Sequence, residues 1–454
     1  MSPKKILFSP VTRLSGLLSV ELTIEDDIIQ EADVSCTMFR GFEYIMREHH
    51  VTDAVYLTQR ICGICSTAHG AIASYLLDML YDNEIQDNAQ YLRNIMLGAD
   101  FLQNHIRHFY FFGLPDYVIM PNYPPFLEQN CNDCRLNDTD NRKVASHYIS
   151  AVKASAKCHQ LLTLFGGKVP HQHSFVHGGA AVAPTADKIN QGLALIRDIR
   201  NFISGCLLPD TELIARCYKD YFSIGRTPGR FLSFGLFRFG SKNEQILWKD
   251  GVLIGDHYSK PRLNLLQEDI THAWYERSQS MANSSVQPAP YKPAAYSWTK
   301  AVLYDGRHYE GGPLARMLFN GFYSGGTSTM DRIVARSLET ELIAELVEKW
   351  LTELEPGEPP IEQNNKLVTN QAIAVTDAMR GPLLHSAQIR EEKVEYYDII
   401  TPTVWNFSPK DVTGRRGPVE SALVGTSIPE PELKYVIPGR IIRSFDPCIA
   451  CATH

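Results

Sequence analysis

The sequence predicts a mainly α-helical protein, in which long helices form a multi-helix bundle core and small β segments lie at the periphery. Two kinds of pattern support this fold class. Four long stretches show the apolar periodicity of amphipathic helices, at residues 88–112, 141–165, 185–215 and 328–354. Shorter stretches, rich in alternating or aromatic residues, lie at 5–36 and 225–265. With 454 residues, of which 44% are hydrophobic, the chain is long enough to bury a substantial core.

The expected N-terminal strands precede the first helices. Apolar residues at every second position from Leu18 to Ile24 alternate with polar or small neighbours, and the acidic residues 25–27 mark a turn. Thr52 or Asp53 is a suitable cap for a short helix that runs towards the first pair of cysteines. A second helix is expected directly after that pair.

The long helices follow in order along the chain. At about 1.5 Å per residue, the stretch 88–112 would span roughly 35–40 Å, the length of a scaffold helix. The stretch 141–165 ends at two glycines, which terminate helices efficiently. The stretch 185–215 is expected to break near Gly205 and Pro209.

Two pairs of cysteines lie near opposite ends of the chain. Cys62 and Cys65 form one pair, and Cys448 and Cys451 form the other, three residues before the terminal His454. The C-x-x-C spacing lets two thiolates bind one metal from a single turn of backbone. If folding brings the pairs together, they form a four-thiolate site. On spacing alone, such a site suits structural zinc, an iron–sulfur cluster or a catalytic metal.

The shared site also bears on domain organisation, because the two pairs cannot meet across a flexible linker. We therefore expect a single large catalytic domain over residues 1–454. It would comprise an N-terminal β segment at about 5–36, a helical core at about 53–355 and an irregular segment at 366–454 that completes the metal site. The proline-containing stretch 116–140 is also expected to be irregular.

Three features disfavour structural zinc. Structural zinc sites usually close a compact module, whereas residues 65 and 448 are 383 positions apart. Arg60, His69 and Asp446 flank the thiolates with charged or titratable groups that a closed structural site does not need. The terminal His454 adds an imidazole close to the last cysteine.

The two cysteine motifs resemble the signatures of the large subunit of nickel–iron hydrogenases. These motifs read QRICGICSTAH at 59–69 and DPCIACATH at 446–454. Five further landmarks match in the expected order: RGFE at 40–43, FGGK at 165–168 with PH at 170–171, YSW at 296–298, GPLAR at 312–316 and WN at 405–406. The resemblance covers essentially the whole chain and implies the large-subunit fold of that family.

The resemblance implies an enzyme that reversibly oxidises dihydrogen to protons and electrons. In this family all four thiolates bind nickel, so Cys62 and Cys448 would be terminal nickel ligands. Cys65 and Cys451 would also bridge to an iron that carries carbon monoxide and cyanide. Soft thiolates suit these metals. The metals would take the hydride and the Cys448 thiolate the proton, because metal coordination keeps a thiolate deprotonated yet basic.

The resemblance also implies roles around the metals. Arg380 matches an arginine whose guanidinium overhangs the metals, where it would position dihydrogen and donate a hydrogen bond to a cyanide. Asp446 would pair with this cation. His69 would donate a hydrogen bond to a bridging thiolate, although a purely structural buried histidine fits the sequence equally well.

A second metal site is implied near the C-terminus. Glu43 and His454 match ligands of a magnesium-type hard cation, and the backbone carbonyl near Ile400 would be a third ligand. A carboxylate, a carbonyl and waters suit such an ion.

Four positions depart from the family pattern. Ser15 stands where a glutamate is usual, Asn104 for an aspartate, Met379 for a proline, and Val404 for a serine or threonine that commonly binds a cyanide. The missing glutamate is the usual first proton acceptor after the thiolate. A serine takes up no proton at ordinary pH, so Ser15 would relay protons only through water or by rotation of its hydroxyl. The proton exit is therefore undetermined by the sequence.

The expected partners follow from charge and composition. A net charge of -7 without a basic stretch disfavours nucleic acid. No apolar run approaches about 20 residues, and residues 1–7 lack the apolar core of a secretory signal. We therefore expect membrane contact only through partners, and either a cytoplasmic location or export to the membrane or periplasmic side with a signal-bearing partner. Electrons need an exit, so an iron–sulfur small subunit is expected in a heterodimer or a higher oligomer.

Two alternative functions stay open at this point. One is a hydrogen-sensing, hydrogenase-like regulatory protein with slow turnover, which the altered proton route would suit. The other is a structural four-cysteine zinc protein.

Other cysteines and histidines carry weaker signals. Cys131 and Cys134 form a third C-x-x-C unit that could hold an extra metal.

The remaining cysteines and a cluster of histidines are expected to be structural. The cysteines, expected to be small buried apolar residues, are Cys36, Cys158, Cys206 and Cys217. The histidines are His171, His173 and His177, of which His171 is the best candidate for a supporting role near the metals.

Overall fold

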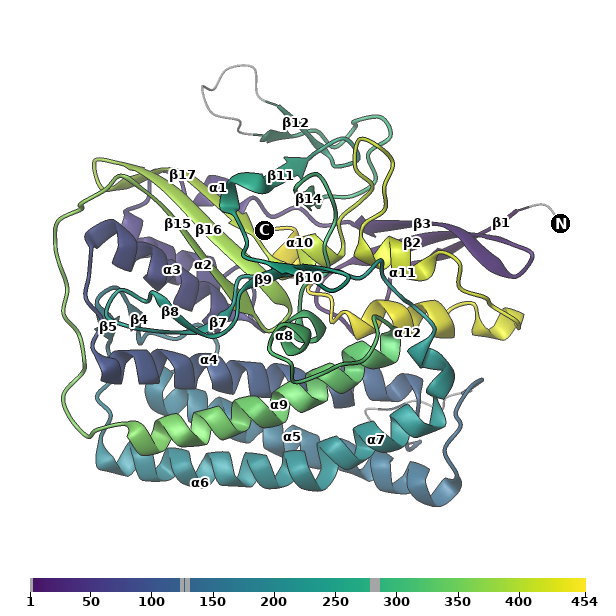
Figure 1. Ribbon diagram of the computed structural model, residues 1–454, viewed down its shortest axis with the longest axis horizontal. Coiled ribbons are helices and arrows are strands. Elements are labelled where there is room, and N and C mark those ends of the chain that lie inside the picture. Colours follow the sequence, from purple (N-terminus) through teal and green to yellow (C-terminus); the bar gives the residue numbers. More distant parts are fainter. Residues whose placement is uncertain (1–2, 123–125, 127–130, 278–285) are drawn as a thin grey trace.

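Long helices lie side by side along one face of the molecule, and the sheets lie above them (Figure 1). The computed structural model describes residues 3–122, 126, 131–277 and 286–454. The long helices are α4 (Asp87–Arg107), α5 (Asp138–Gly166), α6 (Ala186–Phe202), α7 (Leu208–Cys217) and α9 (Thr329–Glu353). The predicted fold class, mainly α with small peripheral β segments, is thus confirmed. Part of the stretch 116–140, predicted to be irregular, lies outside the described residues.

Helix ends follow local capping chemistry. The Asn137 side chain accepts hydrogen bonds from the backbone N–H groups of Thr139 and Asp140, which satisfies two donors at the start of α5. Ser328 and Asp331 form a reciprocal capping box at the start of α9. These contacts explain why the two helices begin where they do.

The predicted break within residues 185–215 is a change of helical pitch. Helix α6 continues through a π-helical turn, Ile203–Leu207, into α7. Pro209 lies at the start of α7 and has no N–H to donate to the preceding turn, which fits the change of pitch at this point. The expected interruption near Gly205 is therefore present, but the chain stays helical across it.

Helix α4 is the central helix of the bundle, because it packs against α3, α5 and α9. Its Gly98 lies against α9, and a Cβ at this position would come within 2.5 Å of Val347 Cγ2. The glycine therefore permits the close approach of the two helices.

We expect Gly98→Ala to lower the free energy of unfolding by roughly 1–3 kcal/mol, because overpacking forces neighbours off their rotamers. Urea or thermal unfolding of the purified protein would measure this change. Gly205→Ala is the matched control, because its Cβ position has no heavy atom within 4 Å among the described residues outside its own stretch of helix. Equal stability of the two variants would contradict the packing argument.

The C-terminal segment is not irregular, so that prediction was wrong. Strands β15 (Gln371–Ala378), β16 (Gly381–Arg390) and β17 (Lys393–Ile400) form an antiparallel sheet. Its central strand β16 is buried on both faces along much of its length, so its sequence lacks the alternation that marks a half-exposed strand. The β15–β16 hairpin has a two-residue turn, Met379 and Arg380.

The N-terminal sheet agrees with the prediction for residues 5–36. Strands β1 (Lys4–Phe8), β2 (Leu18–Glu25) and β3 (Ile28–Cys36) pair in sequence order. Asp26 and Asp27 form the β2–β3 turn with positive φ angles of 48° and 59°, which aspartate tolerates better than most residues. The inner face of this sheet packs against the C-terminal helices.

Shorter elements connect these layers. The shorter helices are α1 (Phe42–Ile45), α2 (Ala54–Gln59), α3 (Ser66–Tyr81), α8 (Pro313–Phe319), α10 (Pro402–Asn406), α11 (Pro418–Leu423), α12 (Val436–Ser444) and α13 (Ile449–Ala452). The shorter strands are β4 (Phe175–Val176), β5 (Gly179–Ala180), β6 (Arg230–Ser233), β7 (Leu236–Phe239), β8 (Gln245–Trp248), β9 (Gly251–Ile254), β10 (His257–Ser259), β11 (Leu266–Asp269), β12 (Tyr275–Arg277), β13 (Val286–Pro288) and β14 (Ala301–Tyr304). The small strands predicted within 225–265 are therefore present.

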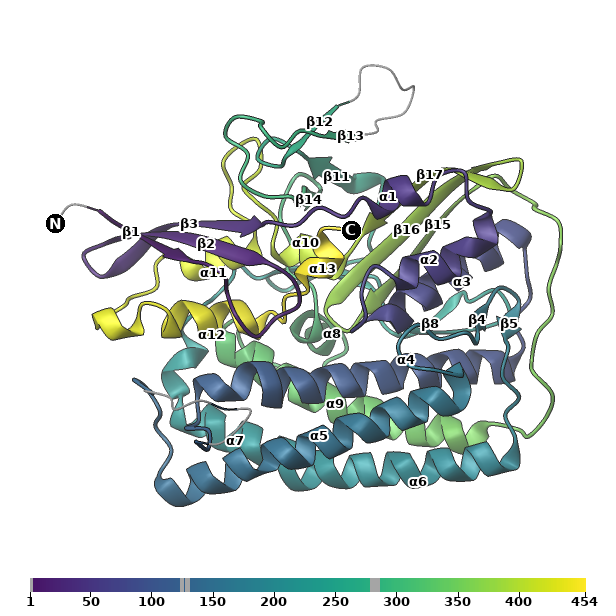
Figure 2. The same cartoon turned by 180° about the vertical axis from the view of Figure 1, so that it is seen from behind.

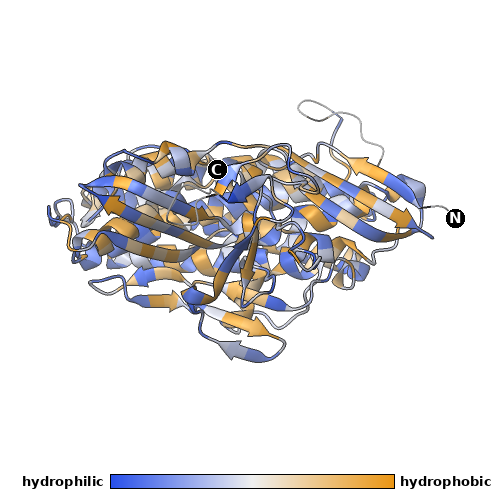
Figure 3. Cartoon of the chain, turned by 90° about the horizontal axis from the view of Figure 1, so that it is seen from above, coloured by the Kyte–Doolittle hydropathy of each residue, from blue (hydrophilic) through white to orange (hydrophobic). Residues whose placement is uncertain are grey.

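The C-terminus ends inside the protein rather than at its edge. Helix α13 lies near the centre of the molecule, between the N-terminal sheet and the β15–β17 sheet (Figure 2). Viewed from above, hydrophilic and hydrophobic residues mix along most elements (Figure 3). Over the described residues, no helix combines the length and the apolar character that a membrane span requires.

Candidate metal centre

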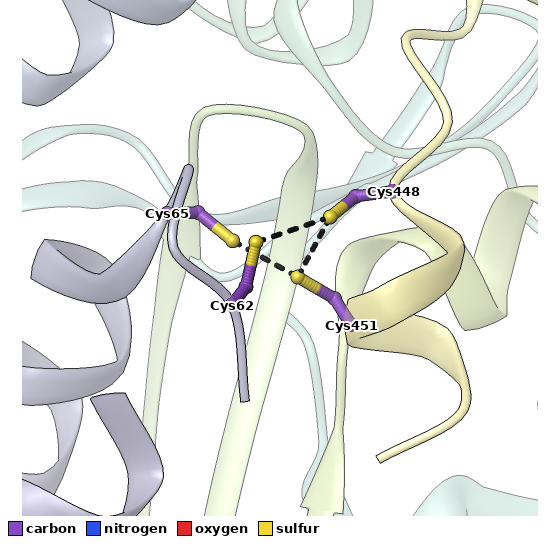
Figure 4. Close-up of side chains that lie close together, drawn as sticks. All are labelled: Cys62, Cys65, Cys448 and Cys451. Carbon is purple, nitrogen blue, oxygen red and sulfur yellow. Dashed lines mark hydrogen bonds between the residues drawn. The ribbon is translucent and has the colours of Figure 1, made fainter. Parts of the chain in front are cut away.

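Two tight backbone turns present the four cysteines to one another (Figure 4). Cys62 lies in the turn between α2 and α3, and Cys65 is the residue at the N-terminal cap of α3. Cys448 caps α13, and Cys451 lies within that helix. Both pairs thus combine one cysteine at a helix N-terminus, where the helix dipole favours a thiolate, with a second cysteine three positions away.

Long-range backbone contacts hold the two pairs in register. The Arg40 guanidinium donates one hydrogen bond to the carbonyl oxygen of Ile61, which precedes Cys62. It donates another to the carbonyl oxygen of Ala450, which lies between Cys448 and Cys451. The Ser15 carbonyl accepts from Ile449 N at 2.7 Å, so the N-terminal segment also anchors α13. Residues from both ends of the chain are therefore fixed together.

The four sulfur atoms form a compact buried cluster. All four lie within 4.8 Å of one another. Cys62 Sγ is 3.4 Å from Cys448 Sγ, and Cys451 Sγ is 2.9 Å from both Cys65 Sγ and Cys448 Sγ. The hydrogen bond with Cys451 is the largest cause that lowers the pKa of Cys448. The hydrogen bond with Cys448 is the largest cause that raises the pKa of Cys65.

A buried polar triad lies beside the cluster. Arg380 Nε donates to the Asp446 carbonyl at 2.8 Å, and Arg380 Nη2 contacts Asp446 Oδ1 at 3.1 Å and Asn104 Oδ1 at 2.6 Å. Asn104 Nδ2 donates to Asp446 Oδ2 at 2.8 Å. The predicted pairing of Arg380 with Asp446 is confirmed. Asn104 completes the triad as a neutral member that both donates and accepts.

The residues present fit a soft transition-metal centre. Four buried thiol groups supply the soft ligands that such metals prefer. Within the described part of the chain, Arg380 Nη1 is buried and has no hydrogen-bond partner. Burial acts to lower the pKa of this arginine, but the charges of Asp446 and then of the cysteines outweigh burial and raise the pKa. A buried guanidinium N–H without a partner is costly, so a negatively charged ligand on a bound metal would satisfy it.

The histidine predicted to contact a thiolate has a different partner. His69 Nδ1 lies 3.2 Å from His385 Nε2, and His385 Nδ1 lies 2.9 Å from the Tyr397 hydroxyl. All three side chains are buried. The sequence pattern missed His385 and Tyr397, because both lie in the sheet that was expected to be irregular. A hydrogen bond from the other nitrogen of His69 to a thiolate stays a prediction.

The residues predicted to hold a hard cation lie close together around a lysine. His454 Nε2 is 3.5 Å from Glu43 Oε1, which also accepts from Ile399 N at 3.3 Å, next to Ile400 at the end of β17. Lys300 Nζ lies 3.9 Å from the same carboxylate oxygen. The pKa of Glu43 is lowered, because the charges of Lys300 and His454 outweigh the effect of burial.

Two further carboxylates at this position escaped the sequence analysis. Lys300 Nζ lies 3.8 Å from Asp398 Oδ1 and 2.8 Å from Glu268 Oε2. Burial raises the pKa of Asp398, and the negative charge of Glu268 raises it further. Lys300 stands two positions after the YSW landmark, and this proximity was the sequence signal that could have pointed to it.

The departures from the family pattern are located as follows. Ser15 is half-buried and joins Cys448 in a β-bridge. Met379 is the buried partner of Arg380 in the hairpin turn, and Val404 is buried in α10. The neighbouring Thr403 hydroxyl accepts a hydrogen bond from Cys448 N at 3.1 Å, a contact that sequence reasoning missed.

The third C-x-x-C unit is not a metal site, so that suggestion was wrong. Cys131 and Cys134 form a disulfide, and a disulfide offers no thiolate to a metal. Cys36 and Cys158 are buried as predicted, whereas Cys206 and Cys217 are only partly buried, contrary to prediction.

The histidines near the glycine-rich turns have structural contacts. His171 N donates to the Ser66 hydroxyl at 3.1 Å. His177 stacks on Tyr81 with ring centroids 4.8 Å apart and lies 3.1 Å from the Asn83 amide. His173 packs edge-on against Tyr56.

Comparisons with known proteins extend this picture. A family model described as nickel-dependent hydrogenase matches residues 40–123, 125–325 and 322–454. The periplasmic NiFeSe hydrogenase large subunit of Desulfomicrobium baculatum is 33% identical across 99% of this chain and 95% of its own length. The hydrogenase-1 large chain of Escherichia coli (strain K12) is 27% identical, with 99% and 95% covered. The solved structure of the reduced Ni-Fe-Se hydrogenase from D. vulgaris Hildenborough matches with a TM-score of 0.95 and 32% identity over 100% of both chains.

A buried cluster of four cysteines beside a charged arginine fits a protein that binds a soft metal. The chain belongs to the nickel-dependent hydrogenase family, as a large subunit. It is an oxidoreductase that acts on dihydrogen, and the term large subunit implies a smaller partner. The resemblance predicted from the two cysteine motifs is confirmed.

Proposed function

We propose that this chain catalyses the reversible oxidation of dihydrogen at a nickel–iron centre held by Cys62, Cys65, Cys448 and Cys451. The observation that carries the proposal is the single buried cluster of four sulfur atoms from opposite ends of the chain. Cys62 and Cys448 would be terminal ligands, and Cys65 and Cys451 would bridge to the iron, which would carry carbon monoxide and cyanide. When bound, the metals supply the Lewis acid and the electron acceptor that heterolytic cleavage of dihydrogen needs.

The chain's own residues manage charge and protons around the centre. Cys448 Sγ takes the proton, since a metal-bound thiolate is deprotonated yet basic. Arg380, held by Asp446 and Asn104, directs its free Nη1–H towards an anionic ligand of the metals and orients the substrate. Burial of all four cysteines excludes water and strengthens these interactions. His69 supports the thiolates from the α3 side.

Infrared spectroscopy with metal analysis tests this assignment. Bands from iron-bound carbon monoxide and cyanide, together with nickel in the purified complex, are the expected result. A preparation that holds zinc, without nickel and without these bands, would identify a structural zinc protein instead. Uptake of dihydrogen with an artificial electron acceptor measures catalysis directly.

A hydrogen-sensing regulatory role is the second candidate. The observation in its favour is Ser15, a residue without a titratable side chain beside Cys448. A sensor would turn over slowly even with a fast artificial acceptor. A high rate in that assay would exclude it.

A hard cation of the magnesium type is the proposed occupant of the second site. Glu43, His454 and the carbonyl near Ile400 would be its protein ligands, and the surrounding carboxylates favour a cation. Magnesium analysis of a Glu43→Gln variant tests the assignment, since an unchanged magnesium content would refute it.

Electrons must leave through a partner. We propose a smaller subunit with iron–sulfur clusters, joined to this chain as a heterodimer or in a larger assembly, because no ferredoxin-like set of cysteines is present in the sequence. Contact with a membrane would then run through partners. Co-purification followed by iron and sulfide analysis of the smaller chain would test this.

A Ser15→Glu variant is expected to keep its metals and to raise the rate of proton-coupled turnover. The new carboxylate would lie beside Cys448 and supply a proton acceptor that serine lacks. The measurement is dihydrogen uptake at saturating acceptor, with nickel content as the control. If the rate does not change, Ser15 does not mark the proton exit.

A further inference from the structure

Protons must leave a cluster whose four cysteines are buried. Ser15 has no titratable side chain, and Asp446 is held in an ion pair with Arg380. Glu339, another buried carboxylate, is held by two hydrogen bonds from Arg316. A carboxyl group that is free to accept a proton must therefore lie elsewhere.

Asp100 is such a group. It lies on α4, one turn before Asn104, and only 3% of its surface is exposed. Its Oδ1 accepts a hydrogen bond from Gln103 Nε2 at 3.0 Å. The same Gln103 nitrogen donates to the carbonyl of Ile64, which directly precedes Cys65, also at 3.0 Å. One amide thus connects Asp100 to the backbone of the first cysteine pair.

The second oxygen of this carboxyl group is available. Among the described residues, Asp100 Oδ2 is buried and has no hydrogen-bond partner. No salt bridge to Asp100 is found within the same residues, which distinguishes it from the carboxylates held by arginines. An unpaired buried carboxylate is costly, so this group favours a neutral, protonated state or a bound water.

The electrostatic surroundings agree with this geometry. Burial raises the pKa of Asp100 to about 7, although Gln103, the nearby Thr67 hydroxyl and the charges of Arg380 and Arg107 oppose the increase. Cys158 on α5 lies near enough to interact electrostatically with both Asp100 and Arg107. A group with a pKa near neutrality exchanges protons in both directions, as a reversible reaction requires.

Polar groups continue from this face of α4 to the surface. Asp100, Gln103 and Arg107 lie at positions i, i+3 and i+7, on one side of the helix. Arg107 Nε donates to the Ser155 hydroxyl at 2.8 Å, and Arg107 Nη2 lies 3.1 Å from His159 Nε2. His159 lines an open surface groove of about 930 Å³ between α5 and α6.

We propose that Asp100 accepts the proton that leaves the cysteine cluster and passes it towards the groove beside His159. The S–H bond of a cluster thiol breaks, a proton moves through bridging water, and an O–H bond forms at Asp100 Oδ2. The carboxylate becomes a neutral acid, and its O–H bond then breaks as the proton passes through water along Arg107 and His159 to solvent in the groove. The inference rests on the proposed function and assigns its proton exit.

The test compares Asp100→Asn with Asp210→Asn in the complete enzyme. Asp210 is the matched control, a buried carboxyl with a raised pKa that hydrogen-bonds to Tyr110 and His147, away from the cluster. We expect Asp100→Asn to keep nickel and the infrared bands of the metals, and to lower dihydrogen uptake by about 10²-fold. Asp210→Asn should keep the rate.

Two further readouts separate proton transfer from general damage. The uptake rate of the unmodified enzyme should rise with pH around 7, as Asp100 ionises, and Asp100→Asn should lose this inflection. Infrared titration should show a protonated carboxylic acid band that disappears around pH 7 and is absent only in Asp100→Asn. Asp100→Glu, which keeps a carboxyl group, should recover part of the rate.

The outcomes distinguish the two levels of the proposal. If the unmodified enzyme takes up no dihydrogen and lacks the metal bands, the proposed function fails. If that enzyme is active but Asp100→Asn keeps its rate and pH profile, only the assignment of Asp100 is overturned. If Asp100→Asn loses its metals, the infrared titration of the unmodified enzyme and the rate of Asp100→Glu still test the proposal. Absence of a carboxylic acid band that titrates around pH 7 refutes it.

Discussion

A Cys448→Ser variant is expected to lose most of its nickel and nearly all dihydrogen uptake. Cys448 contributes a soft sulfur at the point where the two pairs meet, 2.9 Å from Cys451 Sγ and 3.4 Å from Cys62 Sγ. A serine hydroxyl is a hard ligand and is protonated at neutral pH. Loss of a partner that merely supports a metal ligand already costs about 10–100-fold in affinity or activity, so loss of a ligand should cost more.

The measurement is nickel per chain with the uptake rate on the same preparation. Cys36→Ser is the matched control, because Cys36 is an equally buried free cysteine on β3 that lies outside the four-cysteine cluster. It should keep its nickel and its activity. Full nickel content in Cys448→Ser would refute the role of this sulfur as a ligand.

An Arg380→Lys variant is expected to keep nickel but to lose about 10²–10³-fold in kcat, the range for removing one oriented donor. The ammonium would retain a charge near Asp446. It would lose the planar fork that contacts the Asp446 carbonyl, the Asp446 carboxylate and the Asn104 amide together. The buried Nη1–H, which has no hydrogen-bond partner among the described residues, would also disappear.

Steady-state uptake and infrared spectra test this expectation. Arg332→Lys is the control, because Arg332 makes a comparably buried pair with Glu310, at 2.8 and 3.0 Å, away from the cysteines. Both variants should lose stability, but only Arg380→Lys should lose kcat. An equal effect on kcat in the two variants would show that Arg380 acts through folding alone.

Protonation of Asp100 also has a consequence for stability. The folded chain holds this proton up to a pH of about 7, whereas the unfolded chain releases it near the ordinary value for aspartate. Between those values the folded state binds more protons, so this group lowers stability as pH rises. The free energy of unfolding should therefore fall less, or rise more, with increasing pH in Asp100→Asn than in the unmodified protein over that range.

Local sequence patterns were sufficient for the helical bundle. Periodicity over stretches such as 328–354 reports directly which side of a helix is buried, and caps such as Ser328 mark its start. The same patterns failed for β16, because a strand that is buried on both faces has no alternation to detect. The Arg380 hairpin was therefore missed as structure even though the residue was identified by resemblance.

The candidate site could likewise be predicted only in part from the sequence. The four thiolates and their charged flanks are contiguous motifs, so the sequence reveals them. His385, Lys300 and Asp398 belong to no such motif and reach the site only because distant segments pack together. The Cys131–Cys134 disulfide shows the opposite error, in which a motif has the spacing of a metal site without further ligands.

By itself, the sequence determined the four clustered cysteines, the helical class and the family, because each depends on residue identity at short spacing. Only the tertiary structure decided which charged and polar groups surround those cysteines. The pairing of Asn104, Arg380 and Asp446 joins residues up to 342 positions apart, and the position of Asp100 beneath the first cysteine pair depends on how α4 packs. Burial and long-range contact set these properties, because the free energy of a charge depends on what surrounds it in space.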